Sequence, residues 1–118
     1  MALSEPYGAN SLTVSTTELS LVSGTSTLQT VADDGVYQAF LDLSALAIGD
    51  GFIFRVYEKV NSAGTKRVVW SAMFTHAQGI DNAIFVTPTL ILLHGWDMTI
   101  IRTAGADRSI PYSIRKVA

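Results

Sequence analysis

The feature that most constrains this chain is an apolar residue at every second position in two neighbouring segments, residues 51–60 (GFIFRVYEKV) and 66–75 (KRVVWSAMFT). Side chains of a β-strand alternate between its two faces, so this pattern predicts two half-buried strands. The apolar side of the first would carry Phe52, Phe54, Val56 and Val60, and that of the second Val68, Trp70, Ala72 and Phe74. The link between them contains Gly64, so the whole stretch predicts a β-hairpin.

The same alternation predicts further strands at residues 12–22, 26–31, 36–42, 83–94, 97–103 and 109–117. Pro111 has no backbone N–H, so its strand should be an edge or should turn the missing donor outward. Helix is expected only as a single turn at residues 43–47, before Gly49. Seven or eight short strands in 118 residues predict one all-β domain, an antiparallel β-sandwich of the jelly-roll-like kind, over residues 12–118.

Residues 1–11 (MALSEPYGANS) precede the first of these strands and are interpreted as an extended N-terminal arm. Free chain ends usually fray unless something holds them. Two alternatives stay open for this arm: it lies on a neighbouring subunit, or it docks on its own domain.

Composition points to a surface that is poor in charge. Hydrophobic residues make up 48% of the chain and charged residues only 15%, against about 25% in an average globular domain. Residues 11–30 are rich in Ser and Thr and carry one charge, Glu18. Such a chain is either sparingly soluble alone or normally covered by partners.

Charge is distributed unevenly along the chain. Residues 1–60 carry seven acids and two bases, whereas residues 61–118 carry three acids and six bases. The acidic half of one copy could therefore match the basic half of another. Alternatively, the two halves interleave in the fold and the charges mix.

The segment LILLHGWDM, residues 90–98, resembles the loop that supplies an oxyanion hole in α/β-hydrolases. That fold needs a G-x-S-x-G elbow and a parallel sheet with helices, and the sequence has neither signal. We therefore interpret the segment as a strand end, in which Gly95 adopts the turn conformation, Trp96 caps the apolar layer and Asp97 begins the next strand.

No catalytic, cofactor or metal site is predicted. The chain has no cysteine, and its two histidines, His76 and His94, lack carboxylates at spacings typical of a shared site. The pair Asp33-Asp34 before Gly35 is typical of a solvated turn. The net charge of −2 and the short basic pairs argue against nucleic acid as a partner. The apolar run TLILLHGW is far shorter than the roughly 20 residues of a membrane-spanning helix.

The stretches DGVYQAFLDLSALAIGDGFIFRVYEKV and GWDMTIIRTAGADRSIPYSIRKVA, with their G-W-D-M-T and S-I-R-K segments, resemble small all-β structural proteins of tailed phages. The likeness spans residues 34–118. It implies a non-enzymatic component at the capsid surface of a virion, a decoration or cement protein that binds the major capsid protein, often as a homotrimer. The likeness assigns no role to any single residue.

Three functions are compatible with the residues: this virion role, in the head or alternatively in the tail or neck; a carbohydrate-binding module with an aromatic platform; and a small cupin-type enzyme, for which two histidines are too few. We favour the virion role. The residues expected to contact partners are those of the arm and the basic strand residues: Leu3, Tyr7, Arg102, Arg108 and Arg115.

Overall fold

The computed structural model describes residues 3–117 and forms eleven strands, with no helix among the described residues. The strands are β1 (Leu3–Ala9), β2 (Thr13–Val14), β3 (Leu19–Ser20), β4 (Gly35–Asp42), β5 (Gly51–Glu58), β6 (Arg67–Thr75), β7 (Ile84–Val86), β8 (Leu90–Leu92), β9 (Asp97–Ala104), β10 (Arg108–Ser109) and β11 (Tyr112–Val117). A helix long and apolar enough to cross a membrane is therefore not found in this part of the chain.

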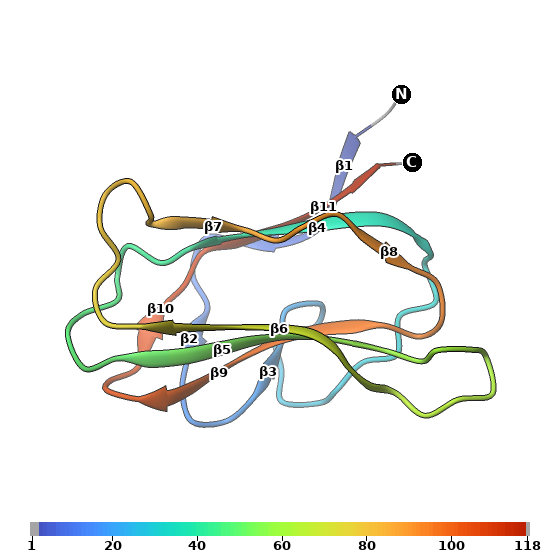
Figure 1. Cartoon of the computed structure of the whole chain (residues 1–118), viewed down its shortest axis with the longest axis horizontal. Helices are drawn as coiled ribbons and strands as arrows, with labels where there is room; N and C mark the ends of the chain where they lie inside the picture. Colours follow the sequence, from blue (N-terminus) through green and yellow to red (C-terminus); the bar gives the residue numbers. More distant parts are fainter. Residues whose placement is uncertain (1–2, 118) are drawn as a thin grey trace.

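Two antiparallel sheets form the two layers of a sandwich (Figure 1). Sheet I, the upper layer, has the order β1-β11-β4-β7, with β8 paired to the other half of β4. Sheet II, the lower layer, has the order β3-β9-β5-β6, and β2 and β10 form a separate small pair. The all-β antiparallel sandwich is confirmed; the finer jelly-roll description stays a prediction.

The core lies between the sheets and is built by the alternation that the sequence shows. Residues of one parity on each strand point inward and are almost completely excluded from solvent. Sheet II contributes Phe52, Phe54, Val56, Met98 and Ile100, and sheet I contributes Tyr37, Ala39, Leu41, Leu92 and Ile114.

The hairpin of β5 and β6 is confirmed, with two corrections at the end next to its connecting loop. The pairing shifts register between Val56 and Tyr57, and this bulge pairs Val68 with Tyr57, so Val68 is exposed. Val60 lies beyond the end of β5 and is also exposed. Neither valine therefore belongs to the core face on which the alternation places it.

Several predicted strands are shorter than expected or are divided in two, so the chain has more strands than the seven or eight predicted. Residues 12–22 give two strands of two residues each, and residues 83–94 are split around Pro88 into β7 and β8. Residues 26–31 contain only one isolated bridge, from Val31 to Trp96. The helical turn expected at 43–47 is a hydrogen-bonded turn from Leu43 to Leu46.

Pro111 does not mark an edge strand. It immediately precedes β11, which lies between β1 and β4 in the middle of sheet I. The missing N–H falls before the ladder begins, and the Pro111 carbonyl accepts a hydrogen bond from the Asp42 N–H at 2.9 Å. The prediction of an edge at this position is therefore wrong.

The segment around Gly95 follows the strand-end interpretation. β8 ends at Leu92, Gly95 has a φ of 57°, and β9 begins at Asp97. A Cβ at Gly95 would lie 2.6 Å from Thr30 Cγ2, so this turn requires glycine for its φ and for the space it leaves. Trp96 is buried inside the core rather than capping it.

The N-terminal segment is a strand of sheet I. Residues 3–9 form β1, which pairs antiparallel with β11 over Leu3↔Val117 to Ala9↔Tyr112. In the single chain this is the second of the two alternatives for the arm, docking on its own domain.

Candidate interaction surface

The outer face of sheet I holds a groove of about 450 Å³. Most of its floor consists of β4 and β11 residues whose neighbours in sequence point into the core, and Tyr37 and Lys116, which share the core side of these strands, also line it. The lining residues, which define the sheet I groove, include Leu3, Glu5, Val36, Gln38, Phe40, Thr89, Arg115 and Val117. Figure 1 shows β1 and the end of β11 rising out of the upper layer, and this bend makes the face concave.

The cause of the bend in β1 is a register shift between Ser4 and Tyr7. An extra residue in one strand kinks it and increases its local twist. The shift also changes which side chains share a face: Leu3 lies opposite Val117 on the outer face, whereas Tyr7 lies opposite Ile114 on the core face.

Arg115 is the charged residue of the groove. Its guanidinium carbon lies 3.7 Å from the centre of the Phe40 ring, a distance typical of a cation–π contact. Its Nε donates to Ser113 Oγ at 3.2 Å, and the Ser113 hydroxyl in turn donates to the Glu5 carboxylate. Within residues 3–117 Arg115 forms no ion pair.

The apolar surface continues beyond the groove over β7 and β8. Val36 lies opposite Ile91, and Phe40 lies opposite Val86. Ile91 is 79% exposed, and Ile84 on the same edge is 57% exposed. Exposed apolar side chains that gather beside a groove are typical of interaction sites.

Two of the five predicted contact residues, Leu3 and Arg115, line this groove together. Tyr7 instead packs edge-on against Trp96, with 6.0 Å between ring centres. Arg102 and Arg108 lie near the β9–β10 loop; Arg102 pairs with Asp107 at 3.3 Å and also donates to the Gly105 carbonyl.

Arg108 pairs with the buried carboxylate of Asp50. Asp50 is 3% exposed, and its oxygens accept hydrogen bonds from Arg108 Nε at 2.7 Å and from the backbone N–H groups of Ala47 and Ala106. Gly105 has a φ of 84°, and a Cβ there would lie 2.1 Å from Asp50 Oδ1. The carboxylate thus fastens the β9–β10 loop to the start of β5.

The Asp50 cluster predicts a specific acid sensitivity. The Arg108 hydrogen bond, assisted by the backbone donors, lowers the pKa of Asp50 from 3.8 to about 2. A carboxyl whose pKa is lower in the folded state stabilises the fold above its unfolded pKa, and this stabilisation is lost as the pH falls from about 4 to about 2. In Asp50→Asn, urea unfolding should therefore show a shallower decline of stability over this window than in the unmodified chain. An equal decline of stability in the two proteins would contradict the assignment of this acid sensitivity to Asp50.

Part of the charge difference between the two halves is neutralised by ion pairs within the chain. Asp50 pairs with Arg108 at 2.7 Å, and Asp33 pairs with Lys116 at 2.8 Å, so both pairs join the acidic half to the basic half. For these residues the halves interleave, as the second alternative proposed.

A second polar cluster lies on the outer face of sheet II. The Glu18 carboxylate pairs with Arg55 at 3.3 Å and accepts hydrogen bonds from the hydroxyls of Tyr57 and Thr99. Burial acts to raise the pKa of Glu18, but these hydrogen bonds outweigh it and lower the pKa. Since three donors already occupy the carboxylate, it is a structural clamp for the segment before β3 and not an available base.

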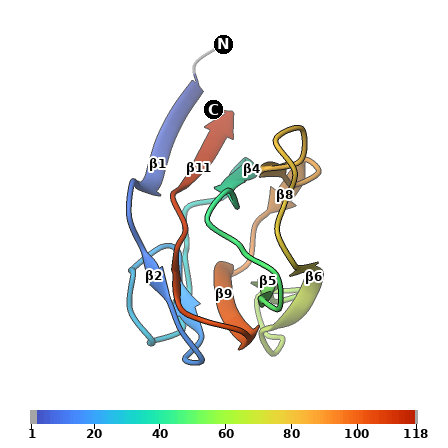
Figure 2. The same ribbon diagram turned by 90° about the vertical axis from the view of Figure 1, so that its left-hand side faces the viewer.

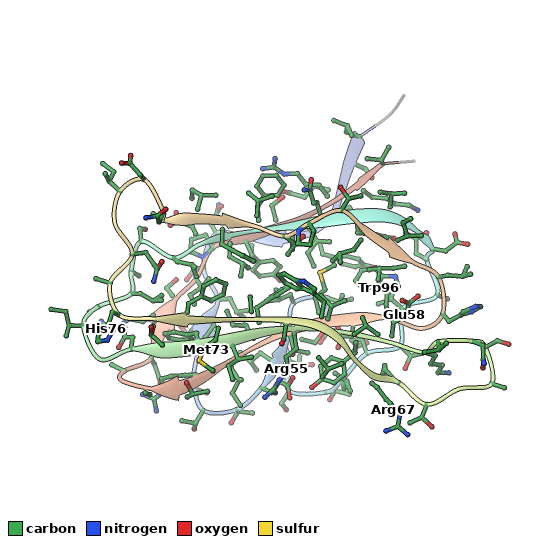
Figure 3. The ribbon with its side chains drawn as sticks, viewed as in Figure 1. Arg55, Glu58, Arg67, Met73, His76 and Trp96 are labelled. Carbon is green, nitrogen blue, oxygen red and sulfur yellow. The ribbon has the colours of Figure 1, made fainter. Side chains whose placement is uncertain are left out.

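The histidines lie apart, His76 beyond the end of β6 (Figure 3) and His94 beside Glu58 between β8 and β9. Among residues 3–117 no group of three or more His, Cys, Asp or Glu side chains could hold a metal ion. All eleven aromatic side chains are buried or half-buried, so the described residues offer no exposed stacking platform.

Sequence reasoning missed most of the groove: Val36, Gln38, Phe40, Thr89 and Val117. One signal lies in β4, whose outer side carries two large apolar residues, Val36 and Phe40, in addition to the buried row Tyr37, Ala39 and Leu41. A strand at a solvent-facing sheet normally alternates with polar residues, and a second apolar face indicates that something covers it. Comparison with protein-family models and with curated protein sequences finds no match for this chain.

Proposed function

We propose that this chain is a non-enzymatic structural protein of a virion, which decorates the capsid surface by binding the major capsid protein through the sheet I groove. The observation that carries the proposal is the groove on the outer face of sheet I, which Arg115 lines beside the Phe40 ring. The likeness to small structural proteins of tailed phages supports the choice of partner.

A protein partner fits this face better than a small molecule. The apolar surface extends from Leu3 on β1 to Ile91 on β8, beyond the groove itself. Covering it would remove apolar area from water at about 25 cal/mol per Å². A repetitive lattice presents many equivalent sites, so a modest affinity per contact is sufficient when several copies bind together.

The groove chemistry also sets what the partner should provide. Arg115 lacks an ion pair among the described residues and lies over an aromatic ring. An apolar segment with one carboxylate would bury the ring and satisfy the guanidinium. The proposal therefore expects an acidic residue within an apolar contact patch of the capsid protein.

Binding to purified phage heads that lack the protein provides the test. We expect Leu3→Asp and Arg115→Glu each to weaken co-sedimentation with heads by at least about tenfold, since central contacts dominate interface energies. Arg67→Glu, an equal charge change at an exposed position of sheet II, is the matched control and should bind like the unmodified chain.

Unchanged binding of Arg115→Glu, or an equal loss in Arg67→Glu, would contradict the use of this face. Binding to purified tails or necks but not to heads would contradict decoration and support the tail or neck alternative. Retention on a glycan array would instead support the carbohydrate-binding module.

A further inference from the structure

Strand β6 is the free edge of sheet II. It is nine residues long, it pairs with β5 on one side, and no strand pairs with its other side in the part of the chain described. Figure 2 shows β6 at the right-hand edge of the lower layer, next to β5. An edge strand presents a row of backbone donors and acceptors that can pair with another strand.

The alternation of hydrogen bonds along the hairpin shows which backbone N–H and C=O groups of β6 do not bond to β5. The N–H of His76 donates to the Asp50 carbonyl at 2.9 Å, one position beyond the pair Gly51↔Thr75. In an antiparallel ladder, alternate residues bond to the same neighbour, so residues 70, 72 and 74 bond to β5. The N–H and C=O groups of Ser71 and Met73 consequently point away from β5, whereas the alternation ends at Val69, the extra residue of the bulge.

A hydrogen bond at Thr75 agrees with this alternation. Thr75 belongs to the same parity, and its carbonyl accepts a hydrogen bond from the Gln78 side chain at 3.1 Å, on the side away from the β5 ladder. For Ser71 and Met73, by contrast, no such partner occurs within residues 3–117.

Apart from the bulge at Val69, the usual protections of an edge are weak on β6. It contains no proline, and its single charge, Arg67, stands at its first residue. Its outward side chains include two apolar ones, Val69 at 47% exposure and Met73 at 66% exposure; Met73 is labelled in Figure 3. Natural edge strands that avoid pairing are generally short, charged or interrupted by proline.

We infer that a second copy of this chain pairs with β6, antiparallel and about a twofold axis through Ser71, so that two copies of sheet II form one continuous sheet. In this register Ser71 faces Ser71 of the second copy, and Val69 faces Met73. The outward N–H and C=O groups of Ser71 in the two copies then satisfy one another, as a hydrogen-bonded pair of an antiparallel ladder does, and the bulge at Val69 limits the length of the shared ladder.

Side-chain sizes and charges favour a second copy as the occupant. On the core side the same register places Trp70 opposite Ala72 of the second copy, a large residue against a small one. Arg67 faces Thr75, so no like charges meet across the axis. The sequence of β6 is therefore complementary to itself in this orientation, as a twofold interface requires.

The outer face of sheet II adds an apolar row that the pairing would extend. Met73 lies opposite Ile53 of β5, and Ile53 lies opposite Ile101 of β9. Across the axis, Val69 of the second copy would join this row next to Met73. The pairing thus covers part of the exposed Met73 side chain in addition to saturating the edge.

This dimer is independent of capsid binding, because β6 lies in sheet II and the groove lies in sheet I. It also differs from the homotrimer that the phage likeness implies. Two sheets joined edge to edge would place one sheet I groove on each half of the dimer.

Charge substitutions at Ser71 test the inference on the purified chain by sedimentation equilibrium. We expect a dimer for the unmodified chain, and Ser71→Lys and Ser71→Glu should each raise its dissociation constant by about fivefold or more, since like charges then face each other across the axis. An equimolar mixture of the two variants should restore dimers, now heterodimers. Ile91→Lys, a similarly exposed change on sheet I, is the control and should leave the dimer intact, and circular dichroism should show every variant folded.

A monomer at every concentration, or a trimer, would overturn the inference. A dimer that withstands both charges at residue 71, or that dissociates with Ile91→Lys instead, would overturn the assignment to β6. If both Ser71 variants were monomeric and their mixture formed no heterodimer, the register about Ser71 would be wrong. None of these results bears on binding to heads, which the Leu3 and Arg115 variants test separately.

Discussion

Trp96→Ala should lower the free energy of unfolding by about 3–5 kcal/mol, the range for removing a large aromatic side chain from a core. The side chain is 0% exposed, and its ring centre lies 4.5 Å from that of Tyr37. The indole N–H donates to the Asp33 carbonyl at 2.9 Å, so the substitution also leaves that acceptor without its partner. Because domains of this size are stable by about 5–15 kcal/mol, the loss is a large fraction of the total.

Urea unfolding followed by circular dichroism measures this effect. Trp70→Ala is the matched control, since Trp70 is only half-buried at the edge strand and should cost less. Trp96→Phe should fall between the unmodified chain and Trp96→Ala, because it keeps a ring but loses the N–H. A loss of less than about 1 kcal/mol in Trp96→Ala would contradict the central place of this residue in the core.

Asp97→Asn should destabilise the fold by about 1–3 kcal/mol, the usual cost of mispairing a buried polar group. The carboxylate is fully buried and accepts three hydrogen bonds of 2.8 Å, from the Ser20 hydroxyl and from the N–H groups of Gln29 and Met98. Ser20 and Met98 donate to one oxygen and Gln29 to the other, so an amide NH₂ must face at least one donor. Unfolding of Asp97→Asn in urea near neutral pH measures the loss.

The pH dependence of this loss has a definite sign. Burial raises the pKa of Asp97 despite its three donors. A carboxyl with a raised pKa in the folded state destabilises the fold as it ionises, so its contribution to stability falls as the pH rises above the unfolded value. The difference between the unmodified chain and Asp97→Asn should therefore be larger at about pH 3 than at about pH 7. A difference that grows towards neutral pH would show that the donors, not burial, determine this pKa.

Asp50 and Asp97 thus have opposite effects on folding stability as the pH falls below neutral. Both carboxylates are almost completely excluded from solvent, but Asp50 has a guanidinium beside it and Asp97 has only neutral donors at hydrogen-bonding distance. The Arg108 hydrogen bond is the largest influence on the pKa of Asp50, whereas burial is the largest influence on the pKa of Asp97.

Much of the sandwich could be predicted from short-range periodicity. Phe52, Phe54 and Val56 share one side of their segment, and Arg55 and Tyr57 share the other side with Ile53, so the alternation predicts a strand and its buried side. Gly95 followed by Trp96 and Asp97 marks a turn between strands, because a tight reversal after an apolar run favours glycine. These features depend on neighbouring residues, which a sequence shows directly.

The errors arise where the alternation shifts by one residue. Leu3 and Tyr7 are four positions apart and should share a face, but the bulge in β1 turns one to the groove and the other to Trp96. Val68 leaves the core face for the same reason. A bulge is set by the partner strand, so the strand sequence by itself does not show it.

Contacts between residues that are far apart in the sequence could not be predicted from it either. Arg108 looked like an exposed strand cation, and only the fold brings it to Asp50, 58 positions earlier in the chain. The groove depends on how β1, β4 and β11 lie side by side, and these strands are far apart in the sequence.

The pairing of β1 with β11 determines how the molecule responds to mechanical load. Leu3 and Val117 are neighbours at the same end of two antiparallel strands. A force pulling these two residues apart acts on the hydrogen bonds of the ladder one after another, so the pair unzips under a small tension. A load that enters through the faces of the sandwich instead compresses a packed interior, which has low compressibility. The domain is therefore suited to being held across its broad faces and poorly suited to transmitting tension between Leu3 and Val117.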